Sequence, residues 1–132
     1  MRFPGCQRLR SQLDFQEVRN RGKSFKTRYF FLQLLVKDSP DPPLRRIGII
    51  TSRRVGNAVK RNRSKRLLRE IFRENQGILP SCCDIVIVMR NTYDELSFQD
   101  LQDLYLKGIR YLARPDNTGQ HKAKGLGNDS PE

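Results

Sequence analysis

The stretch from residue 53 to residue 73, RRVGNAVKRNRSKRLLREIFR, combines dense positive charge with apolar residues at helical spacing. Nine of its twenty-one residues are Lys or Arg, and only Glu70 opposes them. When residues 57–74 are wound at about 100° per residue, one side of the helix holds Leu67, Leu68, Ile71 and Phe72. The opposite side holds Asn62, Arg66, Arg69 and Arg73. The helix therefore has a core face and a cationic face, which explains how a folded chain tolerates so much charge.

The cationic face predicts binding to a polyanion rather than a merely solvated surface. Acidic partners along the helix are nearly absent, and most of the charges are Arg, whose planar fork suits bidentate contact with phosphate. Asn57 is a good N-cap, and the helix start adds a positive end with free N–H groups. Lys60 and Arg61 lie toward the apolar side, so they need to reach past the end of a sheet. The predicted binding residues are Arg53, Arg54, Asn57, Lys60, Arg61, Asn62, Arg63, Lys65, Arg66, Arg69 and Arg73.

The net charge belongs to the part of the chain that is expected to fold. At 132 residues the chain is long enough for one domain with a hydrophobic core. Its formal charge is +12, and because residues 116–132 contribute −1, residues 1–115 carry +13. We predict a single domain over residues 1–115 and a disordered tail over 116–132, which has almost nothing to bury. A basic folded surface favours shaped polyanions such as structured RNA or a DNA duplex.

Neither a targeting segment nor a metal site is expected. The first sixteen residues lack the apolar segment of a signal peptide. The apolar runs at 29–36 and 84–89 are far shorter than the roughly 20 residues of a membrane span. We therefore expect a cytoplasmic protein with no membrane partner. Cys6, Cys82 and Cys83 have no metal-ligand spacing, and the one histidine lies in the tail, so we predict reduced thiols and no bound metal or cofactor.

Capping residues and apolar spacing divide the rest of the chain into helices and strands. Ser11 begins a first helix that Gly22 ends, and Ser97 begins a last helix that Pro115 ends. Strands are predicted at residues 23–37 (one strand or a bent pair), 44–52 and 84–89, with a proline-rich loop at 38–43. The order helix, strands, helix, strand, helix indicates a small α+β sandwich.

The basic segment also resembles a known family. TSRRVGNAVKRNRSKRLLREIFR, with Arg61, Asn62 and Arg63 at its centre, is similar to the signature of the bacterial ribonuclease P protein subunit. DFQEVRNRG upstream resembles the first helix of that family, and the resemblance covers roughly residues 8–114. It implies a four-stranded mixed sheet packed by helices in the order α-β-β-β-α-β-α. It also implies that the basic helix lies in a left-handed crossover between parallel strands, where pattern reasoning alone predicts a right-handed one.

The resemblance implies a function without catalytic residues in this chain. No Ser/His/Asp set, metal-ligand spacing or phosphate-binding Gly loop is present in the sequence. In the family that it resembles, the catalytic groups and the Mg²⁺ ions belong to an RNA subunit. The protein binds that RNA and helps to hold precursor tRNA by its 5′ leader while the RNA hydrolyses one phosphodiester. The chain is thus expected to be the protein subunit of an endoribonuclease holoenzyme.

The resemblance further implies a cleft for the leader between the first helix and the sheet. Family members place an aromatic on the first helix, often a second one turn later, and sometimes one on the sheet. Phe15 matches the first position, but Arg19 and Gln33 stand at the other two. Phe15 as an ordinary core residue remains an alternative. Because Arg grips phosphate without demanding a particular base, leader binding is expected to be sequence-tolerant and salt-sensitive.

Other classes of function remain open from the residues alone. A ribosomal-type RNA-binding protein shares the basicity and the α+β fold. A DNA-binding domain is less favoured because no helix-turn-helix pair is evident. An independent protein nuclease lacks candidate residues. The resemblance favours the ribonuclease P interpretation and implies the catalytic RNA and precursor tRNA as partners, with no DNA.

Overall fold

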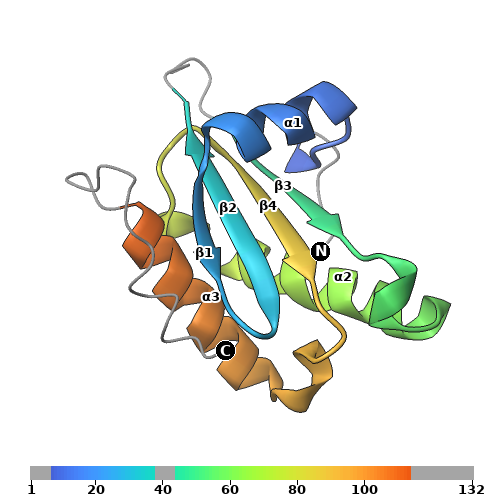
Figure 1. Cartoon of the computed structure of the whole chain (residues 1–132). Coiled ribbons are helices and arrows are strands. Elements are labelled where there is room, and N and C mark those ends of the chain that lie inside the picture. Colours follow the sequence, from blue (N-terminus) through green and yellow to red (C-terminus); the bar gives the residue numbers. More distant parts are fainter. Residues whose placement is uncertain (1–6, 38–43, 114–132) are drawn as a thin grey trace.

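The computed structural model describes residues 7–37 and 44–113, which form three helices and a four-stranded sheet (Figure 1). The helices are α1 (Gln12–Arg21), α2 (Ala58–Glu74) and α3 (Phe98–Leu112). The strands are β1 (Lys23–Lys26), β2 (Phe30–Val36), β3 (Arg45–Ile50) and β4 (Cys83–Met89). Short 3₁₀ turns follow β3, α2 and β4, namely η2 (Arg53–Val55), η3 (Gln76–Ile78) and η4 (Tyr93–Glu95). The predicted element order is confirmed, and the segment 23–37 is a hairpin of two strands.

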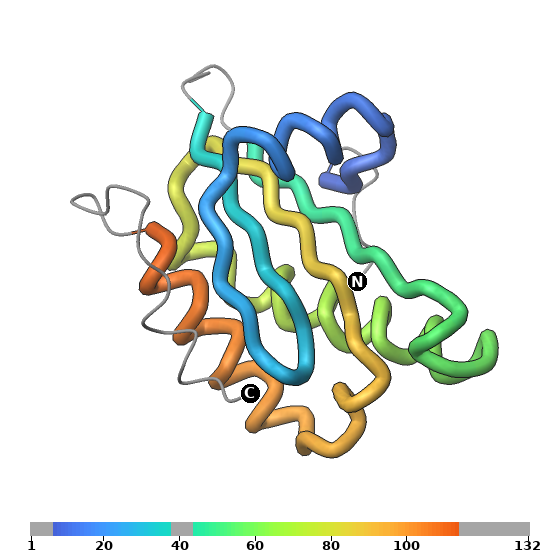
Figure 2. The backbone as a smooth tube through the Cα atoms, in the orientation of Figure 1, coloured from blue at the N-terminus to red at the C-terminus, as the bar shows by residue number. Residues whose placement is uncertain are grey.

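The sheet has the strand order β1-β2-β4-β3 and is mixed. β2 pairs antiparallel with both β1 and β4, whereas β3 pairs parallel with β4. From β3 the chain passes behind the sheet through α2 and returns to β4, as the tube in Figure 2 traces. This crossover is left-handed, as the family resemblance implied. The proline-rich loop 38–43 and the predicted tail 116–132 lie outside the described residues.

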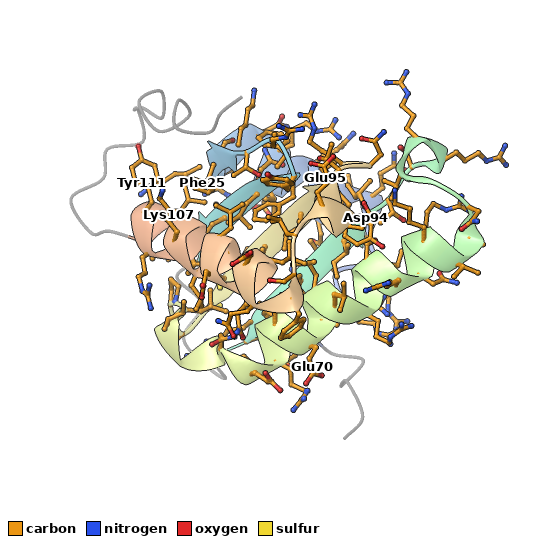
Figure 3. The ribbon with its side chains drawn as sticks, turned by 90° about the horizontal axis from the view of Figure 1, so that it is seen from below. Phe25, Glu70, Asp94, Glu95, Lys107 and Tyr111 are labelled. Atoms are coloured by element: carbon orange, nitrogen blue, oxygen red, sulfur yellow. The ribbon has the colours of Figure 1, made fainter. Side chains whose placement is uncertain are left out.

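Alternating residues of the strands pack into two hydrophobic cores of unequal size, one on each face of the sheet. α2 and α3 cover one face of the sheet, and α1 covers part of the other. Figure 3 shows these layers edge-on. The larger core joins α2 and α3 to inward residues of the strands, for example Phe30, Leu32, Ile85 and Ile87. Phe25 of β1 extends this core to the end of α3, where its ring centroid lies 6.1 Å from that of Tyr111. The smaller core lies under α1 and contains Leu9, Val18, Leu35 and Val86.

A buried ion pair lies on the α1 side of the sheet. Asp84 of β4 is only 1% exposed, and both of its carboxylate oxygens accept hydrogen bonds of 2.8 Å from the guanidinium of Arg46. Arg46 and Asp84 are register partners in the parallel β3–β4 pair. Removing one partner of such a pair leaves an uncompensated buried charge and typically costs about 3–5 kcal/mol. The pair is therefore compatible with this register of the two strands, and a shift of one residue would separate its partners.

Among the described residues, one buried side-chain oxygen is left without a hydrogen bond. Tyr105 of α3 is fully buried in the larger core, and within residues 7–37 and 44–113 its hydroxyl has no partner. Burial raises the pKa of this phenol well above its usual range. Tyr93 provides a contrast, because its hydroxyl donates a 2.8 Å hydrogen bond to the carbonyl oxygen of Lys60.

We predict that Tyr105→Phe increases the free energy of unfolding by about 1 kcal/mol, because the substitution removes an unsatisfied buried hydroxyl. The matched change Tyr93→Phe should lower it by about 1 kcal/mol, because it removes a satisfied one. Urea denaturation of the three proteins measures both effects. A loss of stability in Tyr105→Phe would show that the hydroxyl has a stabilising partner.

Candidate nucleic-acid interface

The start of α2 is shaped by a short turn and a cap. Ser52 caps the η2 turn by accepting from the backbone N–H of Arg54, and Val55 anchors the turn in the core. Gly56 follows with φ +146°, a backbone angle that residues other than glycine rarely adopt. Asn57 Oδ1 then accepts a 2.9 Å hydrogen bond from the N–H of Lys60, as its predicted N-cap role requires. Arg53 and Arg54 are consequently exposed beside the positive end of the helix.

The two faces of α2 lie as the sequence predicted. Leu68, Ile71 and Phe72 are fully buried in the larger core, and Leu67 packs partly against it. On the outer side the exposed or half-buried residues are Asn62, Arg63, Lys65, Arg66, Arg69 and Arg73. Arg73 is partly neutralised, since its Nη2 lies 2.7 Å from a Glu70 oxygen and 3.5 Å from a Glu74 oxygen. The charge of Arg73, near the end of the helix, is therefore less available to a polyanion than that of the exposed Arg63 or Arg66.

Like Arg73, the predicted binding residues Lys60 and Arg61 have intramolecular partners. Lys60 Nζ donates to the carbonyl oxygen of Asn91 at 3.0 Å and lies 3.2 Å from Asp94. Arg61 Nη1 donates to the carbonyl oxygen of Gly56 at 2.7 Å. Lys60 reaches the segment that follows the end of β4, whereas Arg61 turns back to the residue before its own N-cap. Their contacts tie the start of α2 to its own preceding turn and to the segment after β4.

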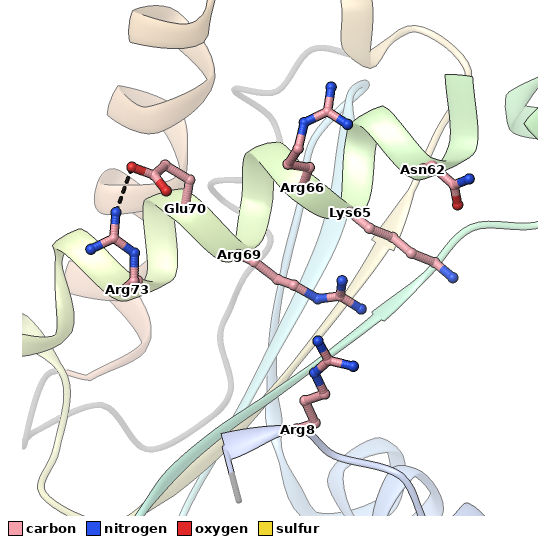
Figure 4. A pocket seen from close by; sticks show the side chains of 7 residues that line it. All are labelled: Arg8, Asn62, Lys65, Arg66, Arg69, Glu70 and Arg73. Atoms are coloured by element: carbon pink, nitrogen blue, oxygen red, sulfur yellow. Dashed lines mark hydrogen bonds and ion pairs between the residues drawn. The ribbon is translucent and has the colours of Figure 1, made fainter. Parts of the chain in front are cut away.

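A depression of about 360 Å³ lies along the outer face of α2 (Figure 4). Its lining residues are Arg8, Asn62, Lys65, Arg66, Arg69, Glu70 and Arg73. The side chains of Arg8 and Arg69 extend toward one another from opposite walls. Burial, followed by the nearby charge of Arg8, lowers the pKa of Arg69. Two guanidinium groups that repel one another in this way form a favourable place for a phosphate.

Arg8 is a residue that the sequence analysis missed. Leu9 donates its N–H to the carbonyl oxygen of Ile47 at 2.9 Å, so the segment before α1 forms a parallel bridge with β3. This pairing carries Arg8 across to α2, far away in the sequence. No periodicity or spacing in the chain signals the juxtaposition, because it arises only when the N-terminal segment is added to the sheet.

The three residues assigned to the leader cleft lie on the α1 side of the sheet, with different exposures. Phe15 is half-buried and packs against the smaller core. Its ring fits there because residue 48 is glycine, where a Cβ would lie 2.5 Å from the ring. Arg19 is exposed on the same helix, whereas Gln33 is only 7% exposed and forms part of the sheet surface opposite Val86. Phe15 thus combines a core contact with partial exposure.

The rest of that sheet face carries a second depression, of about 460 Å³. Phe31 of β2 lines it, with Lys26 Nζ 5.0 Å from the centroid of the ring. Two arginines, Arg54 from η2 and Arg90 after β4, lie on its rim. The sequence analysis named Arg54 but neither Phe31 nor its cationic neighbours. The alternation of β2 contains the signal, since Phe31 and Gln33 must share a face.

The cysteines of the described residues are buried and unpaired with one another. Cys82 and Cys83 are buried free thiols, and burial raises the pKa of Cys83 to about 12. Cys6 lies outside the described residues. Over residues 7–37 and 44–113, no group of three His, Cys, Asp or Glu side chains is arranged to hold a metal ion. None of the helices described is both long and apolar enough to cross a membrane.

Residues 3–113 match the family model described as Ribonuclease P. The chain belongs to the bacterial ribonuclease P protein family. It is 42% identical over 96 residues to the ribonuclease P protein component of Shouchella clausii, covering 73% of this chain and 77% of that one. The corresponding protein of Thermotoga maritima is 40% identical over 93 residues, covering 70% of this chain and 77% of that one.

Solved structures of ribonuclease P proteins share the fold. The Thermotoga maritima protein superposes with a TM-score of 0.70 at 31% identity, covering 81% of this chain and 98% of that one. The Staphylococcus aureus protein gives 0.69 at 26% identity, covering 84% and 98%. The chain is accordingly the protein subunit of an endoribonuclease holoenzyme, and its partner is RNA.

For this ribonuclease P protein we predict that Arg8→Ala and Arg66→Ala each weaken binding to RNA. If each side chain neutralises one phosphate, the negative slope of log affinity against log salt should become less steep by about 0.7–0.9 in each variant. Filter binding at several salt concentrations measures the slope. Arg110 is an exposed residue of α3, so Arg110→Ala is the matched control and should leave the slope nearly unchanged. An Arg8 variant that behaves like this control would remove Arg8 from the interface.

Proposed function

We propose that this chain binds the catalytic RNA of ribonuclease P through α2 and holds the 5′ leader of precursor tRNA on the α1 side of its sheet. The RNA then removes the leader by endonucleolytic cleavage. The observation that carries the proposal is the outer face of α2, where exposed cations cluster opposite a fully buried apolar face in a member of this family. We place the reaction in the cytoplasm.

The acidic residues of the chain support a role in binding rather than in chemistry. Asp94 pairs with Lys60, and Asp103 accepts a hydrogen bond from Gln99. Asp14 pairs with a sheet arginine. In the proposal the RNA holds the Mg²⁺ ions that supply the chemistry of phosphodiester hydrolysis, and the chain binds none by itself. The contribution of the protein is to position the substrate and to neutralise phosphate charge.

The α1 side of the sheet suits a single strand of RNA better than a duplex. Phe15 and Phe31 are its partly exposed aromatic residues, and its cations include Arg19, Lys26 and Arg90. Unpaired bases stack on aromatic rings while phosphates follow basic side chains. Because Arg19 stands at a position where relatives can carry an aromatic, we expect phosphate contact to contribute more to leader binding there than base stacking does. We therefore expect the leader site to tolerate many leader sequences.

The decisive experiment identifies the bound RNA. The tagged protein is purified from lysate of its own cells, and the RNA that accompanies it is sequenced. The proposal expects enrichment of the ribonuclease P RNA and of precursor tRNA. A dominant ribosomal RNA would instead support a ribosomal-type role, and enrichment of DNA fragments would contradict both.

A second prediction separates the leader site from the interface with the catalytic RNA. Arg19→Ala should weaken binding of leader-bearing precursor tRNA to the holoenzyme by about 1 kcal/mol, roughly fivefold, because one contact to the strand is lost. Affinity for mature tRNA without a leader should stay nearly unchanged. Both dissociation constants are measured with the original protein, the variant and the Arg110→Ala control. Equal losses for the two ligands would place Arg19 against the catalytic RNA or the tRNA body.

A third prediction concerns the source of the chemistry. The protein freed of RNA by nuclease treatment and denaturing chromatography, then refolded, should not cleave precursor tRNA at any Mg²⁺ concentration. Activity should return when the catalytic RNA is added. Cleavage at the leader junction by the refolded protein alone would assign the catalytic groups to this chain.

A further inference from the structure

α1 is joined to the sheet by unusually little apolar surface. Of its ten residues only Val18 is fully buried, and Phe15 is half-buried. Leu13, the third large apolar residue of the helix, is 75% exposed. A helix that packs by its apolar stripe alone usually buries three or four residues in every two turns. Apolar packing is therefore a weak determinant of how α1 lies on the sheet.

Ion pairs supply the second connection, and all of them lead to Asp84. Arg46 binds Asp84 with two nitrogens and, through Nη1, lies 3.2 Å from Asp14 of α1. Lys37 Nζ lies 3.2 Å from Asp84 and 3.5 Å from Glu17 of α1. Each cation thus bridges the same buried carboxylate to a different turn of the helix. We call these five residues the Asp84 cluster.

The cluster is arranged to set the orientation of α1. Arg46 lies on β3 and Lys37 directly follows β2, while Asp84 lies on β4 between those two strands. Asp14 and Glu17 are three residues apart and so share one side of the helix. The contacts of Asp14 and Glu17 lie at two points along the helix axis. Together they fix the rotation of α1 about its axis and its position over the sheet. Pairing by charge-assisted hydrogen bonds adds directional control that apolar packing lacks.

We propose that Asp84 is a positioning residue for the leader site: through Arg46 and Lys37 it holds α1 in the orientation in which Phe15 and Arg19 face the leader. This inference rests on the proposed function of the α1 side of the sheet. Asp14 is the chain neighbour of Phe15, so an anchor at Asp14 directly sets where the ring meets Gly48. Arg19 lies one turn further along the same helix and moves with it.

The effect of removing the Asp84 charge distinguishes positioning from a general role in stability. In Asp84→Asn the protein gains one unit of net positive charge, and Arg46 and Lys37 lose a shared partner. Long-range attraction to RNA then stays the same or increases. A purely structural residue would change the affinity for every RNA ligand alike. A positioning residue would lower the affinity for leader-bearing precursor alone.

The test compares dissociation constants of the holoenzyme for leader-bearing precursor and for leaderless tRNA. In Asp84→Asn we expect the preference for precursor to fall about fivefold or more, within the usual range of coupling between sites. Arg46→Lys keeps the positive charge but loses the planar guanidinium. Its preference for precursor should therefore lie between that of Asp84→Asn and that of the original protein. Glu95→Gln removes an exposed carboxylate that pairs with Arg28 and is the control for net charge. Amide hydrogen exchange should become faster in α1 and stay unchanged in α3.

Asp14→Asn keeps the inference testable if Asp84→Asn does not fold. It removes only the anchor on α1 and leaves the buried pair of Arg46 with Asp84 intact, and it should reduce the preference for precursor in the same direction. An unchanged preference in a folded Asp84→Asn or Asp14→Asn protein would overturn the positioning role while leaving the proposed function in place. An original protein with no preference for precursor would overturn both, because no leader site would then exist to be positioned.

Discussion

The parallel pairing of β3 with β4 is the constraint on which both proposed surfaces depend. It sends the chain behind the sheet through α2, so the basic helix must cover the larger core with its apolar face. The same register places Arg46 beside Asp84. The free edge of β3 receives the segment of Arg8, and Gly48 on that strand makes room for Phe15. A shift of one residue would exchange the two faces and disrupt every one of these contacts.

The chain uses its positive charge in two different ways. Some cations pair with carboxylates of the protein itself: Arg46 and Lys37 meet the buried Asp84 and hold α1, and Lys60, at the start of α2, pairs with the exposed Asp94. Others, such as Arg63 and Arg66, are exposed on the outer face of α2. Burial of cations is tolerated only where carboxylates and carbonyl oxygens are supplied. The division follows from packing, and it separates residues that shape the protein from residues that can meet phosphate.

Much of the fold could be predicted because its signals are local. The caps Ser11, Asn57 and Ser97 all accept the hydrogen bonds that begin their helices, and the apolar spacing of α2 correctly identified its buried face. The left-handed crossover could not be predicted from pattern, since the usual preference is for the other hand, and it came from the resemblance. Arg8 was missed because it joins its site through a strand partner distant in the sequence. Phe31 had a local signal in the alternation of β2, but the depression that it lines also needs residues from η2 and from the end of β4. Lys60 and Arg61 were predicted to bind RNA, and what the sequence did not indicate is that both also contact the protein's own backbone and that Lys60 pairs with Asp94.

The sequence by itself determined the family, the order of the elements and the existence of a helix with one apolar and one cationic side. These properties depend on residue type and on spacing within about twenty residues, which the chain carries without folding. Only the tertiary structure decided which cations remain available, how Arg8 meets Arg69, and how Asp84 gathers charges from two neighbouring strand segments and α1. The reason is that the fate of a charge depends on the partners and the burial around it, and these come from residues far apart in the sequence.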